Sequence, residues 1–337
     1  MLDFFLNPSN LLYIIKIISI GIIFPFIISG ISYLYLIISF YFFKKEKNFK
    51  SKHIIIFGGS SGLGEALSIL LSKQEVHLSI ASRTESKLIE TKQKCLKYNS
   101  TCDYYITDIT NETQIKKCLE ESIKKWGFPE LIINCAGIAH PGFIDNMPIE
   151  TYINDMNLNY FGNLKLLKAI VEQYKIKKDL IKNDIDVVCV GSCLGLIGSI
   201  GYSVYAPTKY ALKGLLDSLR FELLTTKIKL HYYGPANMMT PGLMEENKMK
   251  PSVVVDMENN VKCISAEEGA RILLANLDKY MITSEPDLEM LKIGSYFMNS
   301  NNLLDILLLP IAVLGIIFSR KSIEKNIIKK KNTLNLF

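Results

Sequence analysis

One short stretch near the start of the chain restricts its fold more than any other. His53 to Phe57 (HIIIF) is a compact apolar run of the kind that forms a strand buried on both faces. It leads directly into GGSSGLG, Gly58 to Gly64, and then into the helical pattern EALSILLSK. Glycines between a strand and a helix let the backbone approach a pyrophosphate, which then lies at the helix N-terminus. This order predicts the first unit of a dinucleotide-binding sheet.

Strand-like and helix-like segments alternate along the rest of the central chain. Apolar runs that predict strands lie at 76–81, 104–107, 131–133, 187–190 and 230–233, and helical patterns lie at 111–126 and 266–277. The alternation is typical of an α/β fold with a Rossmann-type, doubly wound parallel sheet, here expected as one domain over 51–285. In such a sheet ligands bind outside the carboxyl ends of the strands.

The end of the second strand-like run bears on the choice of cofactor. Ser82 and Arg83 stand where a site for the unphosphorylated ribose usually has an acid that accepts from the 2′-hydroxyl. A base there, with Ser60 and Lys87 as partners, would pair with a 2′-phosphate, which favours NADPH. The alternative is that Arg83 is a solvated loop residue. Asp108 follows the third run and is expected to meet the adenine.

A second motif, GSCLGLIGSIGYSVYAPTK, places three reactive side chains after the fifth run. Ser192 comes just past the end of that run, and Tyr205 and Lys209 are four residues apart in a helical pattern. They therefore share one helix face, where an ammonium would lower the pKa of the phenol and make it a usable proton donor. Such pairs are also common on ordinary helices. The dinucleotide motif upstream favours the chemical interpretation.

The segment after the sixth run is expected to close the site. In GPANMMTPG, Gly234 to Gly242, the backbone and the Thr240 hydroxyl are placed to hold a nicotinamide carboxamide. Residues 243–264 contain no clear strand and several methionines, which predicts a mobile flap over an apolar substrate.

Both ends of the chain carry apolar segments bordered by lysines. Residues 17–43 include no charged side chain, a run long enough to cross the ~30 Å hydrocarbon layer, so a single uncleaved anchor is favoured over a membrane hairpin or a core helix. The excess of lysine over 44–52 predicts a cytosolic catalytic domain. Residues 303–318 contain Asp305 and Pro310 and favour a re-entrant or interfacial segment over a second crossing. The expected organisation is an anchor over 1–50 and a membrane-associated segment over 286–337.

Charge, cysteine and histidine usage narrow the function further. The formal net charge of +6 comes from basic stretches beside the apolar segments, which argues for a membrane surface and against a nucleic-acid groove. The seven cysteines show no CxxC pair, so reduced and mostly buried thiols are expected. The four histidines are scattered, so we interpret them as structural and expect no metal site.

Taken together, the motifs resemble the short-chain dehydrogenase/reductase superfamily over roughly residues 51–285. GGSSGLG is similar to its cofactor loop and NCAG, Asn134 to Gly137, to its fourth-strand motif. The chain also matches the catalytic tetrad in order, with Asn159, Ser192, Tyr205 and Lys209. The resemblance implies that Tyr205 protonates a carbonyl, that Lys209 also holds the ribose, that Ser192 orients the substrate and that Asn159 holds a relay water. It also implies a possible homodimer.

The motifs and the resemblance together predict a set of residues that contact the cofactor. They are Gly58, Ser60, Ser61, Gly62, Leu63, Gly64, Arg83, Lys87, Asp108, Asn134, Ala136, Gly137, Tyr205, Lys209, Pro235, Met238 and Thr240.

Within that superfamily the chain is similar to the 3-ketodihydrosphingosine reductases. The likeness lies in SCLGLIGSIGYSVY, KYALKGLLDSLRFEL and TPGLMEENKMKP, and in an amino-terminal anchor with a hydrophobic carboxyl end. It implies NADPH-dependent reduction of 3-oxosphinganine to sphinganine on the cytosolic face of the endoplasmic reticulum membrane. Two alternatives stay open: a membrane-bound reductase of the same superfamily for 3-ketoacyl-CoA, steroid or retinal, and a non-catalytic Rossmann binding module.

Three positions depart from the superfamily pattern. Phe57 replaces a threonine whose hydroxyl normally braces the glycine loop, so another group must do so. Pro207 lies inside the Tyr-Lys motif, which is acceptable only if the helix begins near Ser203. Ala236 stands where the turn usually has glycine after proline, which affects the expected nicotinamide contacts.

Overall fold

The computed structural model of the chain describes residues 47–98, 100–258 and 262–285, with Ile27, Ile38 and Leu288. Residues 47–285 belong to one compact unit. The predicted anchor over 17–43, apart from Ile27 and Ile38, and the segment over 303–318 lie outside the described residues. Among the described residues, no helix has the length and apolar character needed to cross a bilayer.

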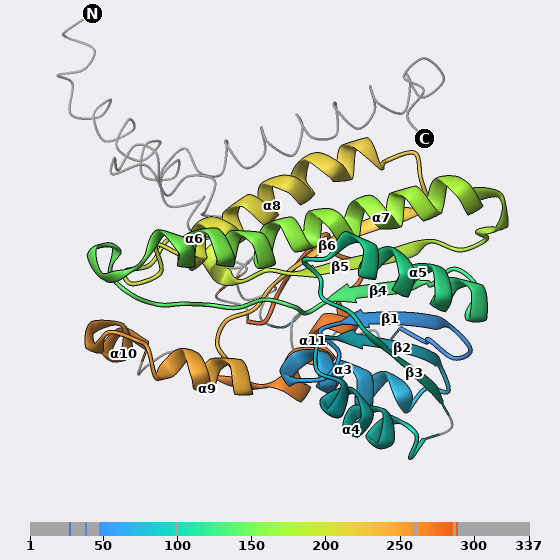
Figure 1. Cartoon of the computed structure of the whole chain (residues 1–337), viewed down its shortest axis with the longest axis horizontal. Coiled ribbons are helices and arrows are strands. Elements are labelled where there is room, and N and C mark those ends of the chain that lie inside the picture. Colours follow the sequence, from blue (N-terminus) through green and yellow to red (C-terminus); the bar gives the residue numbers. More distant parts are fainter. Residues whose placement is uncertain are drawn as a thin grey trace, which may run out of the picture. The chain divides into compact units, whose positions relative to one another are not determined.

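A seven-stranded parallel sheet forms the centre of the described structure (Figure 1). Its strands, in chain order, are β1 His53–Phe57, β2 His77–Ser82, β3 Thr101–Ile106, β4 Leu131–Asn134, β5 Ile185–Val190, β6 Ile228–Gly234 and β9 Met281–Thr283. They lie side by side in the order β3-β2-β1-β4-β5-β6-β9. The order reverses between β1 and β4, which creates the crevice where such sheets bind ligands. The predicted Rossmann-type α/β fold is therefore confirmed.

Helices cover both faces of this sheet. The helices of the described structure are α3 Gly62–Ser72, α4 Glu85–Cys95, α5 Glu112–Trp126, α6 Ile149–Met156, α7 Gly162–Lys177, α8 Tyr205–Glu222, α9 Pro241–Asn247, α10 Ser252–Glu258 and α11 Ala266–Ala275. Figure 1 shows α5, α7 and α8 on one face, and α3, α4 and α11 on the other. Four short helical turns, Ile144–Asn146, Asn157–Phe161, Lys178–Leu180 and Cys193–Gly195, complete the connections.

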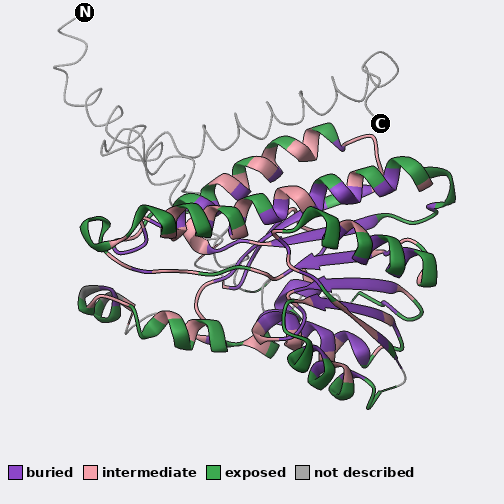
Figure 2. Ribbon diagram, in the orientation of Figure 1, coloured by how far each residue is buried: buried purple, intermediate pink, exposed green. Residues whose placement is uncertain are grey.

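The core lies between the sheet and its helices (Figure 2). All five residues of β1 are buried, and Ile54 and Ile56 pack with residues of α3 and α11 in one apolar cluster. Strands β5 and β6 extend beyond their apolar runs because paired polar residues continue them. Asp186 is buried on β5 with its Oδ1 3.0 Å from Nε2 of His231 on β6. Apolar runs alone miss such positions.

The structure contains short elements in the last third of the described chain that the sequence analysis did not assign. Residues 243–264 contain α10 and most of α9. At Ile264 the short strand β8, Ile264–Ser265, begins and pairs with β7, Met238–Met239. Thr240 begins α9 because its Oγ1 accepts a hydrogen bond from Leu243 N at 3.2 Å, with Pro241 next. The sequence therefore did carry a helix-start signal. Strand β9 was not expected, since three residues give too short a pattern.

Candidate active site

The glycine-rich turn after β1 depends on backbone that only glycine allows. Gly58 and Gly62 have φ angles of +71° and +53°. A Cβ on Gly58 would lie 2.8 Å from Ala136 N, and one on Gly64 would lie 2.1 Å from Gly58 O. The turn therefore packs directly against the backbone after β4 and against its own helix. Their close approach leaves backbone N–H groups at the start of α3 facing the crevice.

Other hydroxyls brace this turn where Phe57 has none. Ser68 Oγ, on the second turn of α3, donates to Gly64 O at 2.8 Å and to Gly59 O at 3.2 Å. Ser60 Oγ donates to Ser82 Oγ at 2.7 Å, which ties the turn to the end of β2. The departure at Phe57 is thus compensated by serines on both sides of the loop.

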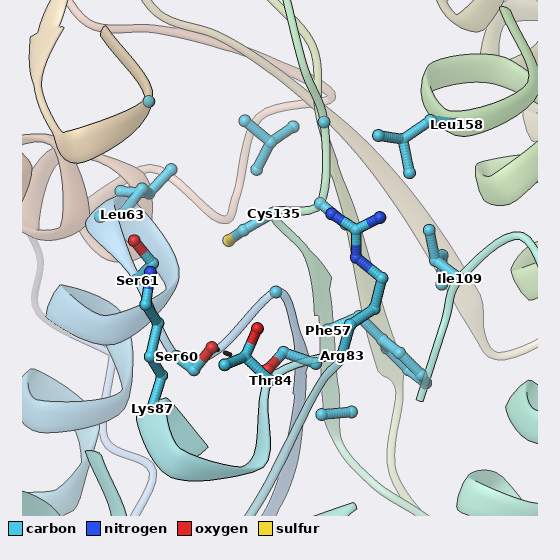
Figure 3. Close-up of a pocket in the computed structure, with 18 of the residues that line it drawn as sticks. Phe57, Ser60, Ser61, Leu63, Arg83, Thr84, Lys87, Ile109, Cys135 and Leu158 are labelled. Carbon is cyan, nitrogen blue, oxygen red and sulfur yellow. Dashed lines mark hydrogen bonds between the residues drawn. The ribbon is translucent and has the colours of Figure 1, made fainter. Parts of the chain in front are cut away.

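A cavity of about 380 Å³ opens at the carboxyl ends of β1, β2 and β4 (Figure 3). Most of the predicted cofactor residues line it. They are Gly58, Ser60, Ser61, Gly62, Leu63, Arg83, Lys87, Asp108, Ala136, Gly137, Met238 and Thr240. The walls thus combine glycine backbone, hydroxyls and charged side chains, which fits a dinucleotide.

The charges in this cavity are mainly basic. Arg83 and Lys87 rise on opposite sides of Ser60 and Thr84 in Figure 3. The acid in the wall is Asp108, whose Oδ1 accepts from Thr110 N and Oγ1, each at 2.8 Å. Burial raises the pKa of this carboxyl, but the Thr110 hydrogen bonds bring it below its ordinary value. The cavity therefore offers two cations to a phosphate.

Five predicted cofactor residues do not line this cavity: Tyr205, Lys209 and Pro235 line a second one, and Gly64 and Asn134 line neither. Gly64 faces Gly58 O, so its role is to let the turn close on the helix. Asn134 is buried at the end of β4, where its Oδ1 accepts from Ala136 N at 3.1 Å and its Nδ2 donates to Asn163 Oδ1 at 2.8 Å. Both residues lie behind the cavity wall and hold its backbone in place.

A second cavity, of about 660 Å³, continues from the first one. Gly137, Met238 and Thr240 belong to the walls of both. Ser192, Tyr205, Lys209, Pro235 and Ala236 line the second cavity. The fold thus brings three of the four predicted catalytic residues to a space that adjoins the dinucleotide cavity.

Tyr205 and Lys209 lie one turn apart at the start of α8, with Lys209 Nζ 5.4 Å from the centre of the Tyr205 ring. Lys209 is buried and donates to Val190 O at 3.1 Å. Burial lowers the pKa of Lys209 to about 8. Burial also raises the pKa of Tyr205, against a hydrogen bond with Ser192 that lowers it. The expected lowering of the Tyr205 pKa by Lys209 is therefore not seen, because burial dominates.

The serine is held by a tyrosine that sequence reasoning missed. Tyr232 on β6 donates to Ser192 O at 2.7 Å, and its oxygen accepts from Ser192 N at 3.1 Å. A Cβ on Gly191 or Gly195 would lie 2.1 Å from Tyr232 atoms. The glycines on either side of the serine thus make room for this clamp, which fixes the backbone at the cavity wall.

Asn159 is buried behind the wall and lines neither cavity. It lies in a π-helical turn, where its Oδ1 accepts from Ile138 N at 2.9 Å and its Nδ2 donates to Ile138 O at 2.8 Å. Its Nδ2 also lies 3.1 Å from Thr208 Oγ1 on α8. Asn159 therefore joins the loop after β4 to the helix of Tyr205, and its role in holding a water stays a prediction.

The other two departures are accommodated locally. Pro207 is the third residue of α8, in the first turn, where backbone N–H groups have no helical partner. Ala236 N donates to Ser284 Oγ at 2.9 Å, and Pro235 O accepts from Cys193 N at 3.0 Å. The turn after β6 is thus fixed to both the serine loop and the end of β9.

Several wall residues were not predicted as site residues. In the first cavity they include Thr84, Ile109 and Leu158, and in the second Tyr202, Glu246 and Glu258. The glutamates lie on α9 and α10, where no helices were expected.

The cysteines and histidines show no metal-site geometry in the described ranges. No group of three His, Cys, Asp or Glu side chains there is arranged to hold a metal ion. All seven cysteines carry free thiols, and four of them are buried.

Comparisons with known proteins agree with this geometry. Residues 52–251 match the family model described as short chain dehydrogenase. The chain is 32% identical to a 3-ketodihydrosphingosine reductase of Dictyostelium discoideum over 87% of this chain and 94% of that protein. It is 26% identical to a 3-dehydrosphinganine reductase of Danio rerio, over 73% of this chain and 75% of that protein.

A solved structure shares the fold. A short-chain type dehydrogenase/reductase from Mycobacterium ulcerans superposes with a TM-score of 0.64 and 19% identity, covering 72% of this chain and 92% of that one. Because residues 52–251 match this family model, the chain belongs to the short chain dehydrogenase family, and it is an oxidoreductase whose fold implies a nicotinamide dinucleotide cofactor.

Proposed function

We propose that this chain reduces 3-oxosphinganine to sphinganine, as the names of its relatives suggest, and that it uses NADPH. One observation carries the proposal. Tyr205, the proton donor, lines a large cavity that opens into the dinucleotide cavity through shared walls. A ketone in the second cavity would therefore lie between the phenol and the cofactor.

The residues of the chain have separable roles in this reaction. When bound, the nicotinamide supplies a hydride to the carbonyl carbon. The Tyr205 phenol gives its proton to the carbonyl oxygen, and its raised pKa keeps that proton in place at neutral pH. Ser192, fixed by Tyr232, orients the same oxygen. Lys209 supplies a positive charge beside the phenol.

The pH dependence of reduction should follow Lys209. Because burial lowers the pKa of its ammonium to about 8, the charge is present at neutral pH and lost as the pH rises through that value. Tyr205 stays protonated over the same range because its pKa is raised. We expect kcat to fall above about pH 8, as measured by initial rates across the range. A flat profile up to about pH 9.5 would show that this charge is not needed.

NADPH is proposed as the preferred cofactor because Arg83 and Lys87 line the dinucleotide cavity with no acid at the end of β2. Arg83→Ala should lower kcat/KM for NADPH by about 10- to 100-fold, and change that for NADH by less than about twofold. The matched control is Arg271→Ala, because Arg271 is an exposed arginine on α11 paired with Glu267. Equal losses with both cofactors would contradict pairing with the 2′-phosphate.

Membrane association, with the catalytic domain on the cytosolic face of the endoplasmic reticulum, is also proposed. Its support is the uncharged run over 17–43, the lysines that follow it and the apolar segment over 303–318. Association as a homodimer remains a proposal as well.

A panel of lipid ketones separates this function from the rival ones. Membranes containing the full chain should oxidise NADPH with 3-oxosphinganine faster than with a 3-ketoacyl-CoA, a steroid ketone or retinal. The second cavity disfavours the acyl-CoA, since Glu245, Glu246 and Glu258 in its wall would repel phosphates. Faster turnover of another ketone would reassign the substrate, and no turnover of any ketone would favour a non-catalytic binding module.

A further inference from the structure

A buried ion-pair network forms part of the wall of the second cavity, opposite the glycine turn. Tyr202 donates its hydroxyl proton toward Glu246 Oε1 at 2.6 Å and Glu258 Oε1 at 2.8 Å. Lys250 Nζ lies 2.6 Å from Glu258 Oε2 and 3.2 Å from Glu246 Oε1. Asn237 Nδ2 donates to Glu258 Oε2 at 2.9 Å. Segments far apart in the sequence thus converge on two carboxylates.

The network has one negative charge more than its partners neutralise. Burial and both carboxylates raise the pKa of Tyr202, so the phenol stays neutral. The Lys250 side chain is 2% exposed, and its single ammonium faces two carboxylates. Because a phenol has one proton, Tyr202 cannot satisfy both of its short carboxylate contacts at once.

The hydrogen-bond partners show which oxygen is still available. Both oxygens of Glu258 have partners, on Tyr202 for Oε1 and on Lys250 and Asn237 for Oε2. Both contacts of Glu246 fall on its Oε1. Within the described part of the chain, no hydrogen bond or ion pair reaches Glu246 Oε2. That side chain is 17% exposed and belongs to the wall of the cavity.

The Glu246 carboxylate lies near Tyr205, the proposed proton donor. The Tyr202 and Tyr205 rings are 6.2 Å apart, and both line the cavity. The Glu246 carboxylate is close enough to contribute to the raised pKa of Tyr205. A cation bound at Glu246 would cancel this contribution and make the phenol a better donor.

We propose that Glu246 binds the ammonium group that 3-oxosphinganine carries on the carbon next to its ketone, and thereby selects amino ketones over neutral lipid ketones. The inference rests on the proposed function. In this proposal the carbonyl oxygen lies at Tyr205 and the neighbouring amino carbon faces Tyr202, whose ring is 6.2 Å from that of Tyr205. Steroid ketones and retinal offer no cation to this acceptor, which would then remain buried beside them without a donor.

The test compares two ketones that differ only in the amino group. Membranes with the full chain are assayed with 3-oxosphinganine and with the same long-chain hydroxy ketone lacking the amine. The wild type should prefer the amino ketone by about 10- to 100-fold in kcat/KM. Glu246→Gln should lose most of this preference, through a KM for the amino ketone that rises relative to the KM for the neutral ketone.

Asp256→Asn is the matched control, because Asp256 is an exposed carboxylate on α10. It should keep the wild-type preference within about twofold. A wild type that reduces both ketones equally, or a folded Glu246→Gln that keeps the preference, would overturn the inference and leave the proposed function standing. Reduction of neither ketone would overturn the proposed function, and the inference with it. If thermal melting shows Glu246→Gln unfolded, the wild-type ratio decides alone.

Discussion

Tyr205→Phe should lower the turnover number for ketone reduction by about 10²- to 10⁴-fold, because it removes the proton donor from the cavity wall. The ring remains to pack against Tyr202, so the fold should be retained. The loss should appear in kcat more than in the KM for cofactor, since the hydroxyl acts on the developing alkoxide. Steady-state rates with a saturating lipid ketone and NADPH measure it.

Tyr210→Phe is the control for this change. Tyr210 lies on the same helix with 45% of its surface exposed and lines neither cavity. Removing the Tyr210 hydroxyl should leave kcat for ketone reduction unchanged. If Tyr205→Phe reduces ketones at the wild-type rate while melting at the same temperature, another group donates the proton.

Gly64→Ala should disrupt the cofactor turn and lower the free energy of unfolding by about 3 kcal/mol. The added Cβ would lie 2.1 Å from Gly58 O and 2.8 Å from Gly58 C, and these are backbone atoms that cannot rotate away. The turn must therefore move from its position against Ala136. We also expect at least about a tenfold rise in the KM for the dinucleotide. Thermal melting and cofactor titration measure the two effects.

Gly214→Ala is the matched change in open space. Gly214 lies inside α8, and no atom stands within 4 Å of its added Cβ. It should stabilise the helix by about 0.5–1 kcal/mol without affecting cofactor affinity. If both alanines behave alike, the close approach at Gly64 does not control the turn.

The sheet and the dinucleotide cavity were predictable because their signals are local. The run His53–Phe57 was assigned to a strand with the bounds that the structure shows. Once the strands are parallel, their carboxyl ends must meet at one edge, so Arg83 and Gly137 could be assigned to one site from separate motifs. Sequence order and strand periodicity carry this information without any knowledge of packing.

What escaped prediction depends on contacts between distant segments. The carboxylates of Glu246 and Glu258 meet at Tyr202 only because α9 and α10 fold over the cavity. The amide of Asn159 is occupied by Ile138, which its position in a helix does not reveal. The raised pKa of Tyr205 follows from burial, which spacing to Lys209 cannot show.

Isotope transfer tests the central claim most directly. Membranes containing the full chain are incubated with 3-oxosphinganine and NADPH that carries deuterium at the transferable position of its nicotinamide. The sphinganine formed should carry deuterium on its hydroxyl-bearing carbon, and membranes with Tyr205→Phe should form almost none. Absence of labelled sphinganine from wild-type membranes that contain folded protein would contradict the proposed reaction.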